Sequence, residues 1–407
     1  MAEIVILGNG IAAYSAAKEI RKYDRESRIT FIYEEKSSTY LRPILSKTYF
    51  KSFQKEKIRL ETDAWYEAQG MRQILGVRII GMSTEEKKVI LDDGREVPYD
   101  SCVYALGASC FVPPFGGKDR KGVMVVRSFK DFDDIRRNLY TASNAVVIGG
   151  GVIGLEMAWE LKQMNCGLTI LEAGPRLMGR LLDEQSAGVL SEAIRRQGIT
   201  VEAGVNIKEI TGDESATGVA CADGSWYPAD VVIVSCGVRA NSQIAREAGL
   251  SCDRGVVVDE WMRTSDPHIY AAGDCMQAAS PNPSLWSYSK VSGETAGYNL
   301  CHPDAPRPFA VPPSPVIISG FGTNLFSIGD VSVGEGVTIV DGDGQNEADG
   351  SALSVDTENV WKRFRVNEAR GGDTHYSRRF YRDGKLKGAV LLGDLSEMAA
   401  IKAELGF

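Results

Sequence analysis

Two glycine-rich segments constrain this chain more than any other feature of its sequence. They occupy residues 8–13 (GNGIAA) and 149–154 (GGGVIG), and each follows an apolar run, at residues 4–7 and 145–148. Glycines at this spacing let the backbone turn sharply after a strand and approach a pyrophosphate. The free N–H groups and the dipole of the following helix favour that anion. The two segments, called fingerprints below, therefore predict two bound dinucleotides.

The same succession of elements is predicted after both fingerprints: a helix, then a strand that ends at a carboxylate. These elements are helix 12–23 and strand 29–33 ending at Glu34, and helix 152–165 and strand 168–171 ending at Glu172. A carboxylate about 20 residues past the first glycine can bind an adenosine ribose. This context favours nucleotide sites over two ordinary glycine-rich turns, and it predicts an α/β fold with two tandem Rossmann-like domains.

Composition narrows the functions that two nucleotides could serve. The chain has 407 residues, 43% hydrophobic and 25% charged, which is typical of a globular protein with large cores. Its apolar runs, such as residues 231–234, are strand-sized, so no membrane insertion is expected. Because the first strand begins by Glu3 or Ile4, we expect no signal peptide and a cytoplasmic location. The net charge of −8 and the lack of a basic block argue against nucleic-acid binding. Among the functions that two bound dinucleotides could serve, hydride transfer between a nicotinamide and a flavin is the simplest.

The placement of the cysteines argues against thiol chemistry. All eight lie after residue 101, and no two form a C-x-x-C or C-x-x-x-x-C pair. The segment after the second strand, residues 37–47, contains no sulfur. The three histidines and the cysteines show no metal-ligand spacing. We therefore expect neither a redox-active disulfide nor a metal.

Residues 40–47 (YLRPILSK) resemble the R-P-x-L-S-K segment of the cysteine-free branch of the FAD-dependent pyridine nucleotide-disulfide oxidoreductase superfamily. That branch includes NADH:rubredoxin and ferredoxin reductases, oxygenase-coupled reductases and apoptosis-inducing flavoproteins. Further segments resemble its motifs in the expected order, at residues 104–108, 235–241, 269–274 and 285–293. These segments differ from the family's motifs at four positions. Leu106 stands in place of threonine, Ala240 in place of proline and Ser292 in place of glutamine, and Lys290 is an unusual residue at its position. The rubredoxin reductases look most similar.

The resemblance implies roles for particular side chains. Asp274 would hold the ribityl chain of FAD, and Trp286 and Ser287 would open a helix directed at the flavin ring. Lys47, placed one turn into a helix that starts at Pro43, would lie beside flavin N5 and pair with Glu156, which would face the nicotinamide. Lys47 and Glu156 are thus the candidate catalytic residues. The alternative for Lys47 is a solvated lysine on a helix face, and the alternative for Glu156 is a carboxylate that complements the helix N-terminus. The candidate cofactor-binding residues are Gly8, Gly10, Ala13, Glu34, Arg42, Pro43, Lys47, Ala105, Gly107, Gly149, Gly151, Gly154, Glu156, Glu172, Gly237, Gly273, Asp274, Trp286 and Ser287.

Glu172 also bears on the choice of pyridine nucleotide. A carboxylate accepts hydrogen bonds from the two ribose hydroxyls but repels a 2′-phosphate, so NADH is expected over NADPH. Arg176 and Arg180 follow closely and leave NADPH possible.

The order of the motifs implies a discontinuous, glutathione-reductase-like arrangement. The FAD domain comprises residues 1–110 and 240–304, and the NAD(H) domain comprises residues 111–239, which begin with a Pro/Gly-rich crossing. Each of these two domains contains a predicted hairpin, with its turn at Asp93-Gly94 in the first and at Asp223-Gly224 in the second. Residues 305–407 form a small α+β C-terminal domain, in which residues 341–356 are expected to be an exposed loop.

These observations predict an FAD-dependent NADH oxidoreductase that passes electrons to a small iron protein, rubredoxin or ferredoxin. Two alternatives remain open. One is an NADH oxidase or peroxide-reducing flavoprotein, and the other is an NADH-sensing flavoprotein of the apoptosis-inducing type.

Overall fold

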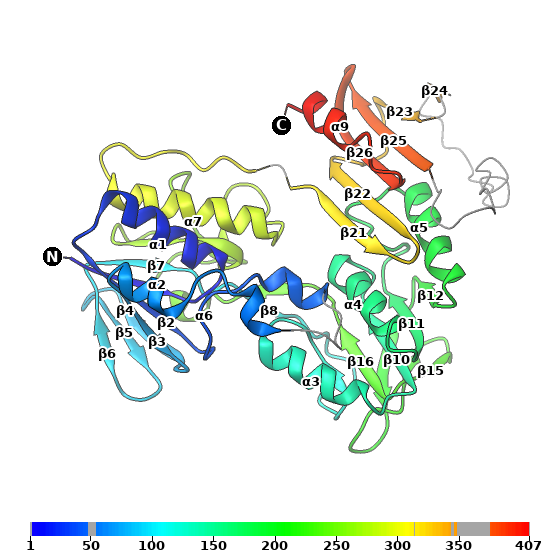
Figure 1. The fold of residues 1–407 in the computed structure, drawn as a ribbon, viewed down its shortest axis with the longest axis horizontal. Helices are drawn as coiled ribbons and strands as arrows, with labels where there is room; N and C mark the ends of the chain where they lie inside the picture. Colours follow the sequence, from blue (N-terminus) through cyan, green and yellow to red (C-terminus); the bar gives the residue numbers. More distant parts are fainter. Residues whose placement is uncertain (1, 48–53, 313, 343–345, 348–374, 407) are drawn as a thin grey trace. The chain divides into compact units, whose positions relative to one another are not determined.

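The computed structural model describes residues 2–47, 54–312, 314–342, 346–347 and 375–406. The chain divides into two compact units (Figure 1). The first unit comprises Met1–Phe111, Arg127–Phe132 and Gly237–Pro312, and the second comprises Val112–Val126, Asp133–Cys236 and Pro313–Phe407. The predicted α/β class is confirmed.

The first unit is built on a five-stranded parallel sheet with the order β19-β7-β1-β2-β3. Its strands are β1 (Glu3–Leu7), β2 (Arg28–Tyr33), β3 (Met71–Leu75), β7 (Ser101–Tyr104) and β19 (Ile269–Ala271). Helix α1 (Ile11–Tyr23) connects β1 to β2, as the first fingerprint predicts. Since β19 comes from far along the chain, the sheet is complete only after the chain has passed through the second unit.

Helix α7 (Trp286–Cys301) lies along α1 beside this sheet (Figure 1). A Cβ on Gly293 would lie 2.2 Å from the Ala12 oxygen, and one on Gly297 would lie 2.4 Å from the Ala16 oxygen. The two helices therefore pack backbone against backbone and run in the same direction. As a result, the N-termini of α1 and α7 lie at the same end of the sheet.

Shorter elements complete the first unit. They are the 3₁₀ helices η1 (Arg42–Ser46), η2 (Lys55–Ile58) and η3 (Gly273–Cys275), helices α2 (Asp63–Ala68) and α6 (Gln243–Glu247), the antiparallel sheet β4 (Ile79–Ser83), β5 (Lys88–Leu91) and β6 (Glu96–Pro98), and the pairs β8 (Ala108–Cys110) with β17 (Val238–Ala240) and β18 (Val256–Val257) with β20 (Met276–Gln277). The turn at Asp93-Gly94 joins β5 to β6 as predicted.

The second unit repeats this plan. Its parallel sheet has the order β12-β11-β10-β16-β9. The strands are β9 (Val123–Met124), β10 (Asn144–Ile148), β11 (Gly167–Glu172), β12 (Thr200–Ala203) and β16 (Val231–Val234). Helix α4 (Val152–Lys162) connects β10 to β11, and helix α5 (Glu184–Arg196) connects β11 to β12. A small antiparallel sheet consists of β13 (Ile207–Thr211), β14 (Gly218–Cys221) and β15 (Trp226–Pro228). Helix α3 (Phe129–Leu139) begins in the first unit and ends in the second. Helix α4 is shorter than predicted and ends at Lys162.

The C-terminal residues form a six-stranded sheet with its own apolar core under helix α9 (Met398–Glu404). Its strands, in sheet order, are β21 (Val316–Gly320), β22 (Thr323–Gly329), β26 (Lys385–Gly393), β25 (His375–Arg382), β23 (Val337–Asp341) and β24 (Asn346–Glu347). The predicted loop at 341–356 lies largely outside the described residues, and Asp341 ends β23. Strand β21 packs against α4, so this sheet belongs to the second unit. The division into three domains at residues 110, 240 and 304 stays a prediction.

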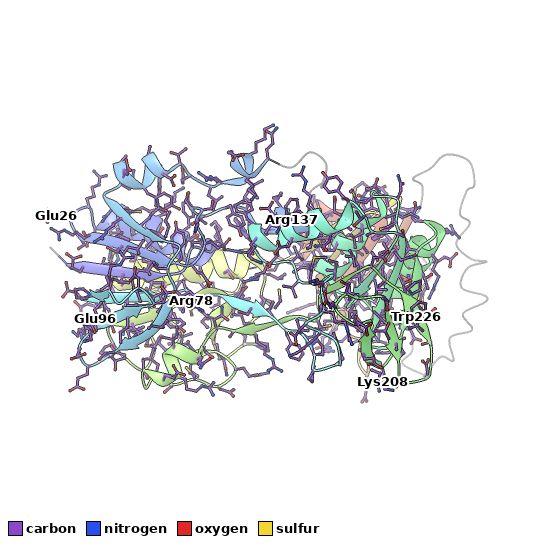
Figure 2. All side chains as sticks on the ribbon, turned by 90° about the horizontal axis from the view of Figure 1, so that it is seen from below. Glu26, Arg78, Glu96, Arg137, Lys208 and Trp226 are labelled. Carbon is purple, nitrogen blue, oxygen red and sulfur yellow. The ribbon has the colours of Figure 1, made fainter. Side chains whose placement is uncertain are left out.

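The surfaces of the two units carry charges of both signs. Glu26, Arg78 and Glu96 point outward from the first unit, and Arg137 and Lys208 point outward from the second (Figure 2). Among the described residues, no helix has the length and apolar character that crossing a membrane requires.

The contact between α1 and α7 leads to a prediction about packing. Gly293→Ala should destabilise the protein by about 1–3 kcal/mol, because its Cβ would collide with the backbone of Ala12. Gly188→Ala in α5 is the matched control: its Cβ meets no atom within 4 Å, and the better helix propensity should stabilise by about 0.5–1 kcal/mol. Urea unfolding measures both changes. Equal effects would show that α1 and α7 can separate at low cost.

Candidate dinucleotide-binding sites

The first fingerprint forms the turn that its glycines predict. Gly8 has φ +106°, and its N–H donates to the Ile32 oxygen of β2 at 2.9 Å. A Cβ there would lie 2.3 Å from the oxygen of Ala105, so only glycine fits. Gly10 is the N-cap of α1, and the space around its Cβ position is open to 4 Å. The turn thus leaves room for a group to approach the helix N-terminus.

The second fingerprint has the same geometry in the second unit. Gly149 has φ +107°, donates to the Leu171 oxygen at 2.8 Å, and would place a Cβ 2.3 Å from the Ser235 oxygen. Gly151 is the N-cap of α4 and is also open. A Cβ on Gly154 would lie 2.0 Å from the Gly149 oxygen, so this glycine permits close packing of helix on strand. The first fingerprint has Ala13 at that place.

The N-termini of α1 and α4 fit an anionic group. Within the described part of the chain, neither N-cap makes a side-chain hydrogen bond, and neither first turn contains an acidic residue. The N–H groups of a first helical turn need acceptors from outside the helix. Pyrophosphate oxygens satisfy both the hydrogen-bond geometry and the helix dipole. The residues present therefore fit a dinucleotide in each unit.

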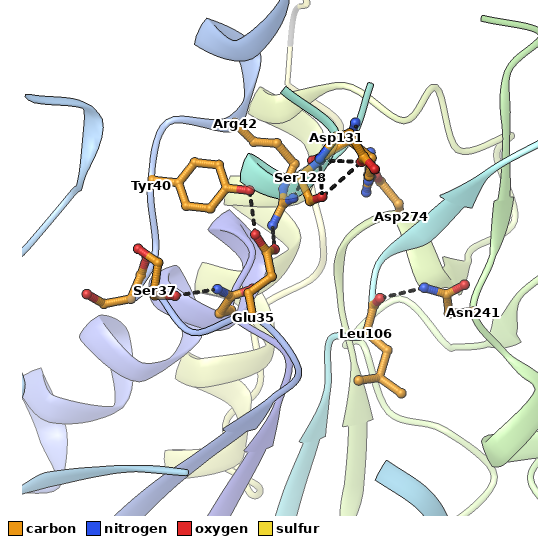
Figure 3. Close-up of polar contacts among 12 residues, drawn as sticks. Glu35, Ser37, Tyr40, Arg42, Leu106, Ser128, Asp131, Asn241 and Asp274 are labelled. Atoms are coloured by element: carbon orange, nitrogen blue, oxygen red, sulfur yellow. Dashed lines mark hydrogen bonds and ion pairs between the residues drawn. The ribbon is translucent and has the colours of Figure 1, made fainter. Parts of the chain in front are cut away.

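A cluster of charged side chains lies near the first fingerprint, where Gly273 approaches Ala12. We call it the Asp274 cluster: Glu35, Arg42, Arg127, Asp131 and Asp274. Figure 3 labels four of these residues, Glu35, Arg42, Asp131 and Asp274. Arg127 Nη2 lies 2.8 Å from Asp274 Oδ2. Arg42 Nη2 lies 2.7 Å from Glu35 Oε1, and Arg42 Nη1 donates to the Arg127 oxygen. The cluster therefore joins three distant stretches of sequence.

Asp274 follows β19 in η3, as its place after a strand predicts. Its second oxygen, Oδ1, accepts a hydrogen bond from Ser289 Oγ of α7 at 2.9 Å. Both oxygens are thus oriented by side chains, and the residue is neither buried nor fully exposed. A carboxylate held in this way can accept hydroxyl hydrogen bonds from a bound sugar alcohol.

Sequence reasoning missed Arg127. Its segment, Arg127–Phe132, belongs to the first unit although the chain on both sides of it belongs to the second. Asp131 fixes this segment by accepting from the backbone N–H groups of Arg127 at 3.0 Å and Ser128 at 2.8 Å. The Ser-x-x-Asp spacing is a helix N-terminus signal that could have been found. The partner Asp274, however, could not have been found from local sequence.

Glu35 also emerges only from the structure. The first glycine of each fingerprint donates to the last residue of the second strand that pairs with the first strand, Ile32 in one unit and Leu171 in the other. The position equivalent to Glu172 is therefore Tyr33, and not Glu34. Glu34 is exposed, whereas Glu35 accepts hydrogen bonds from Tyr40 Oη and Arg42 Nη2, both at 2.7 Å.

The remaining flavin-side candidates lie around the same end of the sheet. Ala105 is buried, Gly107 has φ +63°, and the Asn241 N–H donates to the Gly107 oxygen at 2.9 Å. Asn241 Nδ2 also donates to the Leu106 oxygen (Figure 3). Gly237 and Gly273 have φ +93° and +82°. Pro43 is exposed near the start of η1.

Trp286 and Ser287 open α7 as predicted. The Nε1 of Trp286 is buried and has no hydrogen-bond partner among the described residues. A buried donor without an acceptor is costly, which fits an acceptor supplied by a bound group.

Lys47 is placed differently from the prediction. Residues Arg42–Ser46 form a 3₁₀ helix, with Lys47 N–H donating to the Ile44 oxygen at 3.0 Å, so Lys47 caps a short helix instead of lying one turn into a longer one. Pro43 near the start of η1 is compatible with this tighter turn. Lys47 is exposed and belongs to the first unit, whereas Glu156 is 7% exposed and belongs to the second. Their pairing stays a prediction.

Glu156 has a second carboxylate beside it. Glu160, one turn later on α4, is also 7% exposed, and its Oε2 is buried without a hydrogen-bond partner in the described structure. Burial, followed by repulsion from Glu156, raises the pKa of Glu160 to about 7. Glu160 therefore holds a proton at pH values where an ordinary glutamate has lost it.

Glu172 lies where the second strand ends. Its Oε2 accepts from Gly150 N–H and its Oε1 from Gly174 N–H, both at 2.6 Å. Arg176 turns back onto its own loop and donates from Nε to the Leu182 oxygen at 3.1 Å, whereas Arg180 is exposed. Within the described part of the chain, the guanidinium of Arg180 makes no hydrogen bond to this loop, in contrast to that of Arg176.

Comparison with known proteins agrees with this geometry. Residues 2–293 match the family model described as pyridine nucleotide-disulphide oxidoreductase. The chain is 33% identical over 350 residues to the ferredoxin–NAD(+) reductase component of the biphenyl dioxygenase system of Paraburkholderia xenovorans, covering 84% of each chain. It is 34% identical over 277 residues to rubredoxin-NAD(+) reductase of Pseudomonas putida, covering 68% of this chain and 72% of that protein.

A longer relative and a solved structure extend the comparison. The chain is 30% identical over 396 residues to the NAD(P)H nitrite reductase of Bacillus subtilis, with 97% of this chain aligned but only 46% of that protein. The chain thus spans about half the length of that relative. The ferredoxin reductase for the CYP199A2 system of Rhodopseudomonas palustris superimposes with a TM-score of 0.85 at 25% identity, covering 100% of this chain and 95% of that one.

The raised pKa of Glu160 leads to a prediction about pH. The folded protein keeps a proton that the unfolded chain releases near pH 4.5, so this stabilisation is full below pH 4.5 and is lost as the pH rises through about 7. Glu160→Gln should therefore gain stability relative to wild type between pH 5 and pH 8, by at most about 3 kcal/mol. Urea unfolding at both pH values measures the change.

Glu192→Gln on α5 is the control, because Glu192 is in an ion pair with Arg196 at the surface. Its effect should be nearly the same at the two pH values. If Glu160→Gln behaves in the same way, Glu160 is ionised in the folded protein at pH 5.

Proposed function

The chain belongs to the pyridine nucleotide-disulphide oxidoreductase family, and from that premise we propose that it is an FAD-dependent NADH oxidoreductase that passes electrons to rubredoxin or ferredoxin. FAD, when bound, accepts a hydride and releases electrons singly. The observation that carries the proposal is the pair of fingerprints, each with the same turn at an uncapped helix N-terminus. The relatives named as ferredoxin and rubredoxin reductases support the class of acceptor.

In this proposal, the first unit holds FAD. Gly8 and Gly10 admit the pyrophosphate to the N-terminus of α1, and Asp274 accepts from the ribityl hydroxyls. Arg127 and Arg42 supply positive charge next to these groups. Burial opposes the charge of Arg42, but its ion pair with Glu35 helps to keep its pKa above the ordinary value, so the charge persists at working pH. Trp286 Nε1 donates to an acceptor on the cofactor.

The second unit holds NADH. Gly149 and Gly151 admit its pyrophosphate to the N-terminus of α4, and Glu172 lies where the adenosine ribose is expected. Lys47 and Glu156 are proposed to act at the reacting ends of the two nucleotides. There the lysine would set the charge beside the flavin, and the glutamate would orient the lysine.

The thiols support a mechanism without a redox-active disulfide, as in the cysteine-free branch of the family. All eight cysteines lie in the described part of the chain, and none of them is in a disulfide. Burial raises the pKa of Cys275 to about 12 and the pKa of Cys236 and Cys301 to about 11. A neutral thiol is a poor nucleophile. The flavin is therefore proposed as the sole store of electrons.

The proposal predicts which acceptor is reduced. The FAD-loaded chain should oxidise NADH fastest with rubredoxin or ferredoxin present, and slowly with oxygen or peroxide alone. Stopped-flow absorbance with a panel of acceptors measures these rates. Faster reduction of oxygen or peroxide would favour an oxidase. Slow oxidation with every acceptor, together with a change in association state on NADH addition, would favour a sensor.

A reductive titration tests the electron count in the same samples. Two electrons per FAD should complete the reduction, because no thiol takes part. Alkylation of accessible cysteines should leave NADH-dependent dye reduction nearly unchanged. Four electrons per FAD would show a thiol relay.

Glu172 predicts the nucleotide preference. We expect kcat/KM for NADH to exceed that for NADPH at least about tenfold, since repulsion of the 2′-phosphate contributes on the order of 1.4 kcal/mol. Glu172→Gln should narrow the ratio mainly by improving NADPH. Arg180→Ala is the matched comparison: a large loss of NADPH use there would mean that Arg180, and not Glu172, governs the pocket.

A further inference from the structure

The loop at residues 174–183 connects β11 to α5 and touches the second fingerprint. The Met178 N–H donates to the Gly150 oxygen at 2.9 Å. Leu177 is fully buried, and a Cβ on Gly150 would lie 2.3 Å from its Cδ2. Glu172, just before the loop, accepts from the Gly150 N–H. Any shift of the 174–183 loop therefore moves the turn that receives the pyrophosphate.

The far end of this loop is held by the C-terminal sheet. Ser327 Oγ of β22 donates to the Leu181 oxygen at 2.6 Å. Arg378 Nη1 of β25 lies 2.8 Å from Asp183 Oδ2, where Asp183 is the N-cap of α5. Tyr376 Oη and Ser186 Oγ are 3.0 Å apart. Strands β22 and β25, which β26 separates in the sheet, thus both hold the loop and the first turn of α5.

The contact made by Arg378 is a buried one. The side chains of Arg378 and Asp183 are 5% and 4% exposed, and Arg378 Nε lies 3.1 Å from Asp341 Oδ1. Arg378 Nη1 also donates to Gln185 Oε1. Desolvation of both charges offsets much of the attraction in a buried ion pair, so such a pair is weak evidence for added stability. Its hydrogen bonds nevertheless fix where the two side chains lie. The pair therefore suits a positioning role.

We propose that the C-terminal sheet positions the pyridine nucleotide. Arg378, Tyr376 and Ser327 hold the 174–183 loop against Gly150, and this sets the affinity of the second fingerprint for the adenosine half of NAD(H). The inference rests on the proposed function, because it assigns the second fingerprint to NAD(H). Arg378 is a positioning residue, since it acts through the loop.

The test compares two adjacent arginines of β25. Successive side chains of a strand point to opposite sides, and Arg379 pairs with Glu397 at 2.7 Å within the C-terminal sheet region. Binding of NAD⁺ to the FAD-loaded protein is measured by calorimetry. Arg378→Met should raise Kd about tenfold, Arg378→Lys should recover part of the loss, and Arg379→Met should change Kd less than about twofold.

A second variant keeps the buried ion pair in case Arg378→Met does not fold. Tyr376→Phe combined with Ser327→Ala removes two hydrogen bonds to the loop and α5, and should raise Kd about threefold to tenfold. In dye reduction, KM for NADH should rise while kcat and the flavin absorbance stay unchanged.

The outcomes separate the two proposals. If wild type binds NAD⁺, and the double variant and every Arg378 variant that folds, Arg378→Met included, keep Kd within about twofold, the positioning role is wrong and the proposed function stands. If wild type does not bind NAD⁺, the proposed function itself fails. A fall in kcat with unchanged KM would also overturn the positioning role.

Discussion

Both candidate sites depend on one close approach of backbone to backbone. The first glycine of each fingerprint lies against a carbonyl of the neighbouring strand, Ala105 in the first unit and Ser235 in the second. That approach requires a positive φ and no side chain. It turns the chain directly into the following helix, whose first N–H groups have no acceptor within the helix. Without this turn, neither α1 nor α4 would offer an anion site.

The first unit shows how side chains from distant sequence complete such a site. Arg127 reaches Asp274 from a short segment that leaves the second unit and returns to it. Arg42 donates to the backbone of that segment and pairs with Glu35. Because α7 packs on α1 through glycines, Ser289 and Trp286 lie at the same end of the sheet. The site is therefore assembled by the return of the chain and by helix packing together.

The second unit combines its nucleotide fold with a sheet from the end of the chain. The contacts of Arg378 and Ser327 reach the loop behind Glu172 and do not reach the fingerprint itself. Glu160, buried beside Glu156, adds a group whose pKa lies near neutrality because of its surroundings. Both features depend on burial, which places charge in a medium of low dielectric constant and makes its effect large.

The sequence by itself determined the elements whose signals are local. Glycine spacing and the apolar runs identified β1, α1, β10 and α4, since a sharp turn between a buried strand and a helix has few solutions. The motif order also anticipated the α/β class and the places of Asp274 and Trp286. Tertiary structure alone decided that Glu35 and not Glu34 is anchored, that Lys47 follows a 3₁₀ helix, and that Arg127 and Arg378 find their carboxylates. Those outcomes depend on strand register and on contacts between residues far apart in the chain, for which spacing along the sequence carries no information.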